Sequence, residues 1–127
     1  MKLNRLITLS IFALLGLTTI VGCTKEVDTI AVVIVKNATN DFVSGATVML
    51  KAEGTTTEPN SINTEIYPMS ATSNAQGEAT FNFNKVYQVG QAGVAVLTIE
   101  VVAGAATGQG VIKVEEEERT EEVVFVI

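Results

Sequence analysis

Residues 74–84, NAQGEATFNFN, decide the fold of this chain. Asn74 to Gly77 form a turn signal, because Asn favours turn positions and Gly accepts a positive φ angle. After the turn, apolar and polar residues alternate strictly: Ala79, Phe81 and Phe83 against Thr80, Asn82 and Asn84. Since successive side chains of a strand point to opposite faces, this stretch predicts a half-buried β-strand over 78–84.

The remainder of the chain after residue 28 has the same character, with short runs of strand-forming residues between clusters of Gly, Asn, Asp and Ser. No part of it keeps the 3.6-residue period of a helix. Seven strands at this spacing are typical of a two-sheet sandwich, so the predicted fold is all-β. The other six strands are expected at 29–36, 46–53, 65–73, 94–103, 111–117 and 120–127, with 104–110 as a flexible segment.

The strand patterns also predict the core and one sheet edge. In 46–53 the core face is expected to hold Val48, Leu50 and Ala52, and in 94–103 it is expected to hold Leu97, Ile99 and Val101. Pro68 cannot donate a ladder hydrogen bond, so its strand should lie at an edge or contain a bulge. The loops 54–64 and 86–93 are long and polar, and we expect them to be contact surfaces.

The chain begins like a secretory signal. Lys2 and Arg5 are followed by an uncharged, largely apolar stretch from Leu6 to Gly22. A basic start, an apolar middle and a small residue before the cut are the parts of a signal peptide, here expected as a signal helix. The apolar stretch also lies at the lower limit for a helix that spans a membrane, so length alone leaves that alternative open.

Cys23 is the only cysteine, and it ends this apolar stretch. Ile20-Val21-Gly22-Cys23 resembles the lipobox of bacterial lipoproteins, in which the cysteine becomes the lipid-modified amino terminus. The resemblance implies a signal peptide over 1–22 and a lipidated tether that begins at Cys23. Together with the strand pattern, it divides the rest of the chain into a tether over 23–29 and a β-sandwich domain over 30–127. Two or three acyl chains hold a protein on a membrane where one does not. The resemblance thus implies a lipid anchor on Cys23 and a location at the bacterial outer membrane, on its periplasmic face or at the cell surface.

Two short patterns follow the cysteine. Thr24-Lys25-Glu26-Val27-Asp28 resembles the Bacteroidetes-type signal that sends lipoproteins to the outer face of the outer membrane, and it equally fits a solvated tether. Asp28-Thr29-Ile30 resembles the O-glycosylation motif of the same group of bacteria, which makes Thr29 a possible acceptor.

Composition excludes several functions. Removal of the signal takes Lys2 and Arg5 away, so six Lys and Arg remain against 14 Asp and Glu, and the net charge changes from −6 to −8. An acidic domain repels phosphate backbones, so no nucleic-acid partner is expected. The chain contains no His and no second cysteine. Histidine-dependent catalytic triads, His-ligated zinc and thiolate sites therefore cannot be built from it. We expect no enzyme activity, cofactor or metal.

Two stretches, 44–50 (SGATVML) and 71–81 (ATSNAQGEATF), together resemble the transthyretin-like, carboxypeptidase-regulatory type of β-sandwich. The resemblance covers about residues 30 to 102. It implies an Ig-like two-sheet sandwich in which Gly77 takes a positive φ in the hairpin. This pattern describes a fold and carries no active site.

Two polar clusters are candidates for calcium, and each has a simpler interpretation. Glu115 to Glu118 could bind a cation, but strand alternation separates neighbouring carboxylates, so a solvated hairpin end is favoured. Asn37, Asn40 and Asp41 have better ligand chemistry and also ordinary turn chemistry. Tyr67 and Tyr87 could stack on a sugar or simply pack.

These observations predict a membrane-anchored, non-enzymatic lipoprotein that binds or supports a protein or glycan of the cell envelope. The alternative is a pilus or adhesion subunit, because fimbrillins are lipoproteins with transthyretin-like domains that assemble by strand exchange. The apolar strand end Val123 to Ile127 could be the exchanged segment, or it could complete its own sheet.

Overall fold

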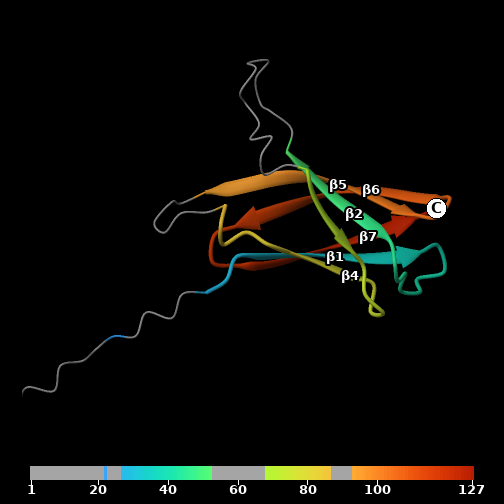
Figure 1. Cartoon of the computed structure of the whole chain (residues 1–127), viewed down its shortest axis with the longest axis horizontal. Coiled ribbons are helices and arrows are strands. Elements are labelled where there is room, and N and C mark those ends of the chain that lie inside the picture. Colours follow the sequence, from blue (N-terminus) through green and yellow to red (C-terminus); the bar gives the residue numbers. More distant parts are fainter. Residues whose placement is uncertain (1–21, 23–26, 53–67, 87–92) are drawn as a thin grey trace, which may run out of the picture.

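The computed structural model describes Gly22 and residues 27–52, 68–86 and 93–127. These ranges contain seven strands in two packed sheets (Figure 1). The prediction of an all-β sandwich is confirmed. The strands are β1 (Ile30–Asn37), β2 (Thr47–Ala52), β3 (Met69–Thr72), β4 (Glu78–Asn82), β5 (Val94–Ala103), β6 (Ala106–Glu115) and β7 (Arg119–Val126).

One sheet has the order β4-β1-β7 and the other has the order β3-β2-β5-β6. Within the first sheet, β1 is antiparallel to β4 and parallel to β7, which it pairs over its whole length. We call the end of the sandwich where β1 begins, at Ile30, the near end. The far end is the one where β7 finishes, at Val126. The C-terminus lies at the far end, on the right of Figure 1.

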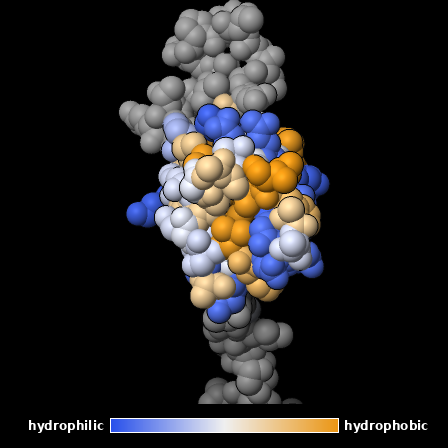
Figure 2. All heavy atoms as spheres, turned by 90° about the vertical axis from the view of Figure 1, so that its right-hand side faces the viewer, coloured by the Kyte–Doolittle hydropathy of each residue, from blue (hydrophilic) through white to orange (hydrophobic). Residues whose placement is uncertain are grey.

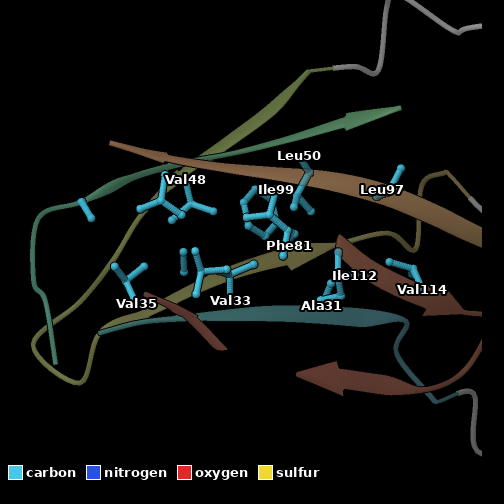
Figure 3. Close-up of a cluster of buried hydrophobic side chains, with 14 of the residues drawn as sticks. Ala31, Val33, Val35, Val48, Leu50, Phe81, Leu97, Ile99, Ile112 and Val114 are labelled. Atoms are coloured by element: carbon cyan, nitrogen blue, oxygen red, sulfur yellow. The ribbon is translucent and has the colours of Figure 1, made fainter. Parts of the chain in front are cut away.

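The core lies between the two sheets, and Figure 3 shows its valine, leucine, isoleucine and phenylalanine side chains. Ala79, Phe81 and Phe83 are buried, as their alternation predicts. Val48 and Leu50 of β2 and Leu97, Ile99 and Val101 of β5 are buried as well. The third residue expected on the β2 core face, Ala52, is half-buried and packs against the core. The expectation for these core faces is otherwise confirmed.

The strand β1 is apolar on both faces because it is the central strand of its sheet. Ala31, Val33 and Val35 belong to the core, whereas Val32 is fully buried without being a member of that cluster. A strand buried on both faces reads as a continuous apolar run, which explains the sequence of β1.

The expectation of a flexible segment over 104–110 is wrong. Only Gly104 and Ala105 form the turn between β5 and β6, and β6 begins at Ala106, five residues earlier than expected. Gly104 has a φ of +63°, which glycine adopts without strain. Gly108 and Gly110 are inside β6, where their lack of a side chain allows β7 to approach closely.

Other boundaries move by a few residues. The β6–β7 turn lies at Glu116 and Glu117, before residues 118–119, where the expected strands leave a turn, and Glu117 has a φ of +59°. The strand β3 begins directly after Pro68 and is an edge strand, as the proline indicates. Gly77 has the predicted positive φ, +72°.

Candidate interaction surface

The proposed lipid attachment site, Cys23, lies outside the described residues. Its neighbour Gly22 is described and exposed. Within the described part of the chain, no helix has the length and apolarity that crossing a membrane requires.

Thr29, which the sequence places in the tether, belongs to the folded domain. It is 3 % exposed, and its Oγ1 accepts a hydrogen bond from the Glu117 N–H at 2.8 Å. Its own N–H donates to Asn84 Oδ1, also at 2.8 Å. The residue therefore joins the start of β1 to the end of the β4 segment and to the β6–β7 turn. A hydroxyl held in this way is inaccessible in the folded domain, so O-glycosylation of Thr29 stays a prediction that its burial opposes.

The glutamate cluster lies at the near end, in and beside the β6–β7 turn. Glu115 forms an ion pair with Lys113 at 2.6 Å. The hydrogen bond from Lys113 lowers the pKa of Glu115, and the same bond raises the pKa of Lys113. Among the described residues, no three His, Cys, Asp or Glu side chains are grouped so that they could hold a metal ion.

The second calcium candidate closes a turn at the far end. Asn37 Oδ1 accepts hydrogen bonds from the N–H groups of Thr39 and Asp41, and Asn40 Oδ1 accepts one from Lys36. The Thr39 hydroxyl donates to Asp41 Oδ2 at 2.6 Å. Hydrogen bonds from Thr39 and then Asn37 lower the pKa of Asp41. These oxygens are occupied by the turn itself, which is the simpler of the two interpretations.

The predicted contact loop 54–64 and most of the loop 86–93 lie outside the described residues, as do Tyr67 and Tyr87. The strands beside them show where these segments leave the sandwich. Ala52 pairs with Leu97 near the start of β5, and Val94 pairs with Glu115 next to the β6–β7 turn. Both segments therefore leave from the near end, the end at which the chain enters the domain.

A different surface, at the far half of the sandwich, has the character of a contact site. Five exposed apolar side chains come from the adjacent strands β5, β6 and β7 and from the C-terminus: Val102, Val111, Val123, Phe125 and Ile127. We call this set the corner patch. Figure 2 views the far end and shows a strip of hydrophobic surface between hydrophilic residues. Val102, Phe125 and Ile127 line one hollow, and exposed apolar side chains that gather in this way mark interaction sites on soluble proteins.

The corner patch contains a shallow open hollow of about 730 Å³. Its walls include Val102, Phe125 and Ile127, and its polar lining comes from Glu100, Thr107 and Gln109. Gly108 also lines it, through its backbone. Ile127 stands beside the hollow and is 88 % exposed, which makes it the most protruding large apolar residue described.

Two backbone hydrogen bonds hold the corner together. The Thr107 N–H donates to the Ile127 main-chain oxygen at 3.1 Å, and the Ile127 N–H donates to the Thr107 oxygen at 3.0 Å. This exchange links the last strand of one sheet to the last strand of the other. Two of the residues that line the hollow, Thr107 and Ile127, are therefore held in place by main-chain hydrogen bonds.

Charge is scarce in the corner patch. Glu100 is the one residue with an ionisable side chain among those that line the hollow, and it forms an ion pair with Lys51 at 2.6 Å. An apolar centre with a polar rim and few charges is the usual composition of a protein contact surface.

The sequence predicts that individual residues of this surface face outward, but not that they lie together. Val102 alternates outward on β5, and Val123, Phe125 and Ile127 share one face of the last strand. The hairpin end at Glu115 to Glu118 indicates that β6 and β7 are neighbours, but no local pattern indicates how closely they cross at the corner. The placement of Gly108 and Gly110 two residues apart was the available signal, because glycine in a strand often marks a close backbone approach.

No model of a known protein family matches the chain, and no curated protein resembles it significantly in sequence.

Proposed function

We propose that this chain is a lipid-anchored, non-enzymatic module of the bacterial outer membrane that binds or supports another envelope component through its far half. The observation that carries the proposal is the separation of the two ends. The chain enters the sandwich at Ile30 at the near end, whereas the corner patch lies from the middle of the sandwich to the far end. A domain tethered through Cys23 would present the patch away from the membrane.

Electrostatics supports the same orientation. Asp28 and Glu115 to Glu118 are at the near end, beside the start of β1. Anionic lipid headgroups repel such a cluster over distances of about one Debye length, roughly 8 Å at physiological ionic strength. We therefore expect the near end to stand off from the bilayer while the tether holds it there.

The non-enzymatic assignment rests on the residue inventory. Without His and with its one cysteine assigned to the lipid, the chain would depend on carboxylates, hydroxyls and amines for any chemistry. In the described domain, three carboxylates are in ion pairs, those of Glu100, Glu115 and Glu121. A binding or structural role needs no catalytic side chain.

The pilus-subunit alternative has less support. The strand β7 pairs with β1 over eight residues and buries Val124 and Val126 in the core of its own domain. A strand used in this way completes its own sheet. We therefore keep strand exchange as the second candidate.

The anchor is tested by expressing the full chain and a Cys23→Ser variant in a bacterium that processes lipoproteins. We expect mass spectrometry to find a mature chain that begins at acylated Cys23, and we expect the variant to leave the membrane fraction. Proteolysis of intact cells then reports which membrane face carries the domain. A mature protein that still begins at Met1, or a variant that stays in the membrane, would overturn the proposal.

A further inference from the structure

The strand through which the chain enters the sandwich and the strand with which it ends run side by side in the same direction. Ile30 pairs with Arg119 at the near end, and Asn37 pairs with Val126 at the far end, so the register is unbroken over the eight residues of β1. The entry of β1 and the exit of β7 therefore lie at opposite ends of the sandwich (Figure 1).

Parallel pairing decides how a pull on these two ends loads the hydrogen bonds. A pull on β1 toward the near end and on β7 toward the far end is directed along both strands. Because the bonds of a parallel pair are evenly spaced along it, all of them carry part of this pull at once. A pull that separates the two strands at one end loads the first bond alone, and then the next. The lengthwise direction should therefore resist the greater force.

We propose that the sandwich carries tension along its length, from the chain entry at the near end to the far end of β7, and that the β1–β7 pair bears this tension. The use of this property rests on the proposed function, because a tethered near end and a far half that holds another envelope component place the domain under such a pull. The property itself depends on the fold alone.

Core packing also opposes the sliding of β1. The strand is central in its sheet, and Ala31, Val33 and Val35 are fully buried in the core. Sliding by one residue toward the near end would bring Lys36 to the position of Val35, and sliding by two residues would bring Asn37 there. Either slip places a charged or polar side chain in the apolar core, where it has lost its water. The native register is therefore favoured until the strand leaves the sheet altogether.

The entry point is fixed to the neighbours of β1 on both sides. The Thr29 main-chain oxygen accepts a hydrogen bond from the Phe83 N–H at 2.9 Å, and the Thr29 N–H donates to Asn84 Oδ1 at 2.8 Å. On the other side, Thr29 Oγ1 accepts from the Glu117 N–H at 2.8 Å. A pull that enters through residue 28 is therefore shared with the end of the β4 segment and with the β6–β7 turn.

The far end of β7 is fixed to the second sheet. Ile127, the residue after β7, exchanges two main-chain hydrogen bonds with Thr107 of β6. The strand β6 in turn pairs with β5 along the whole of both strands. A load on Ile127 therefore reaches both sheets.

Single-molecule force spectroscopy with two attachment geometries tests the proposal. The full chain is made by cell-free synthesis without lipid, so that Cys23 keeps its thiol and serves as one attachment point. For a lengthwise pull the second point is Ile127→Cys, at a residue that is 88 % exposed. For a pull at the near end alone it is Glu118→Cys, at the exposed residue before β7. Forced unfolding follows the unfolding rate, so at one loading rate we expect the lengthwise geometry to need about twice the force of the other, or more.

Two measurements make the geometries comparable. Thermal unfolding without force should occur at the same temperature in both variants, since both substituted side chains are exposed. The length gained on unfolding, at most about 3.6 Å for each released residue, shows whether the whole sandwich has opened. Equal forces in the two geometries, or a lengthwise pull that releases β7 alone at low force, would overturn the proposal.

The anchor is tested separately, because these chains carry no lipid. Equal forces reject the tension-bearing role of the β1–β7 pair and leave the lipid anchor on Cys23 intact. A high lengthwise force together with an unmodified Cys23 in cells supports the mechanical inference and rejects the anchor.

Discussion

Gly108 of β6 lies so close to Phe125 of β7 that a Cβ at Gly108 would be 2.5 Å from the Phe125 main-chain oxygen. Real side chains do not approach backbone oxygen so closely. The two strands can cross at this point only because one residue has no side chain. The crossing brings Thr107 and Ile127 into their double hydrogen bond and shapes the hollow of the corner patch.

We expect Gly108→Ala to destabilise the domain by about 1–3 kcal/mol, the usual cost of forcing extra volume into a packed site. Gly110→Ala is the matched control, because its Cβ would meet the Val124 Cγ2 at 3.0 Å, a contact that a small side-chain movement relieves. Urea unfolding of both variants gives the comparison. If Gly110→Ala proves as destabilising as Gly108→Ala, backbone crossing is not the reason for glycine at 108.

These glycines also show where prediction from the sequence fails. Gly104, Gly108 and Gly110 look alike in the sequence and suggest one flexible segment. Only Gly104 is in a turn. At Gly108 the backbone of β7, a strand of the other sheet, leaves no room for a Cβ, whereas a Cβ at Gly110 would meet the Val124 side chain, which can move. A requirement created by a tertiary neighbour leaves no local signature beyond the spacing of the two residues.

Thr29→Val should destabilise the domain by about 0.5–1.5 kcal/mol, the usual net contribution of one hydrogen bond. The change keeps the shape of the side chain but removes the oxygen that accepts from the Glu117 N–H in a part-buried hydrogen bond. Thr80→Val is the matched control, since Thr80 is exposed on β4. Thermal unfolding followed by circular dichroism measures both.

A glycan on the Thr29 hydroxyl would also break the hydrogen bond to Glu117, and it would destabilise the domain more because the side chain is buried. If mass spectrometry finds Thr29 glycosylated in a domain that keeps its full unfolding temperature, the buried position of its hydroxyl is wrong. If Thr29→Val unfolds at the same temperature as the unaltered chain, the hydrogen bond to Glu117 does not hold the turn.

Asp41 is expected to titrate below the ordinary aspartate range of about 4. Hydrogen bonds from Thr39 and Asn37 favour its ionised form and lower its pKa in the folded state. The pKa of Asp41 is lower in the folded than in the unfolded state, so ionised Asp41 stabilises the folded state at pH values above its unfolded pKa. This stabilisation is lost as the pH falls from the unfolded pKa through the folded pKa.

Titration of the Asp41 carboxyl by NMR measures this shift. Thr39→Ala removes the larger cause, so the pKa of Asp41 should move up toward its ordinary value. Thr47→Val, an exposed threonine on β2, should not change it. An Asp41 pKa that is unaffected by Thr39→Ala would show that the hydroxyl does not hold the carboxylate.

The fold class follows from the sequence because it depends on local periodicity. Alternation around Phe81 and Phe83 and the unbroken run of β1 identify strands and core faces without knowledge of their partners. The pairing of β1 with β7 is different. These strands are parallel and separated by most of the chain, so their register depends on packing of the whole sandwich. The corner patch exists only after that pairing is made, and it could not be predicted.

Deletion of residues 123–127 distinguishes the two candidate functions. It removes Val124 and Val126 from the core, each contributing about 1.5–3 kcal/mol by burial, together with the Thr107–Ile127 bonds. Globular domains have a total stability of about 5–15 kcal/mol, so we expect the shortened chain to lose its cooperative unfolding transition.

The matched control for this deletion is the double substitution Val123→Thr and Phe125→Ser, which changes the exposed face of β7 and keeps its buried valines. This variant should fold, because only exposed side chains are altered. Circular dichroism and size-exclusion chromatography follow both chains. A shortened chain that stays folded and monomeric, beside an intact chain that polymerises, would show that β7 is dispensable within its own domain and would favour strand exchange. An unfolded shortened chain beside a folded double variant would show that β7 completes its own sheet, as its eight-residue pairing with β1 indicates.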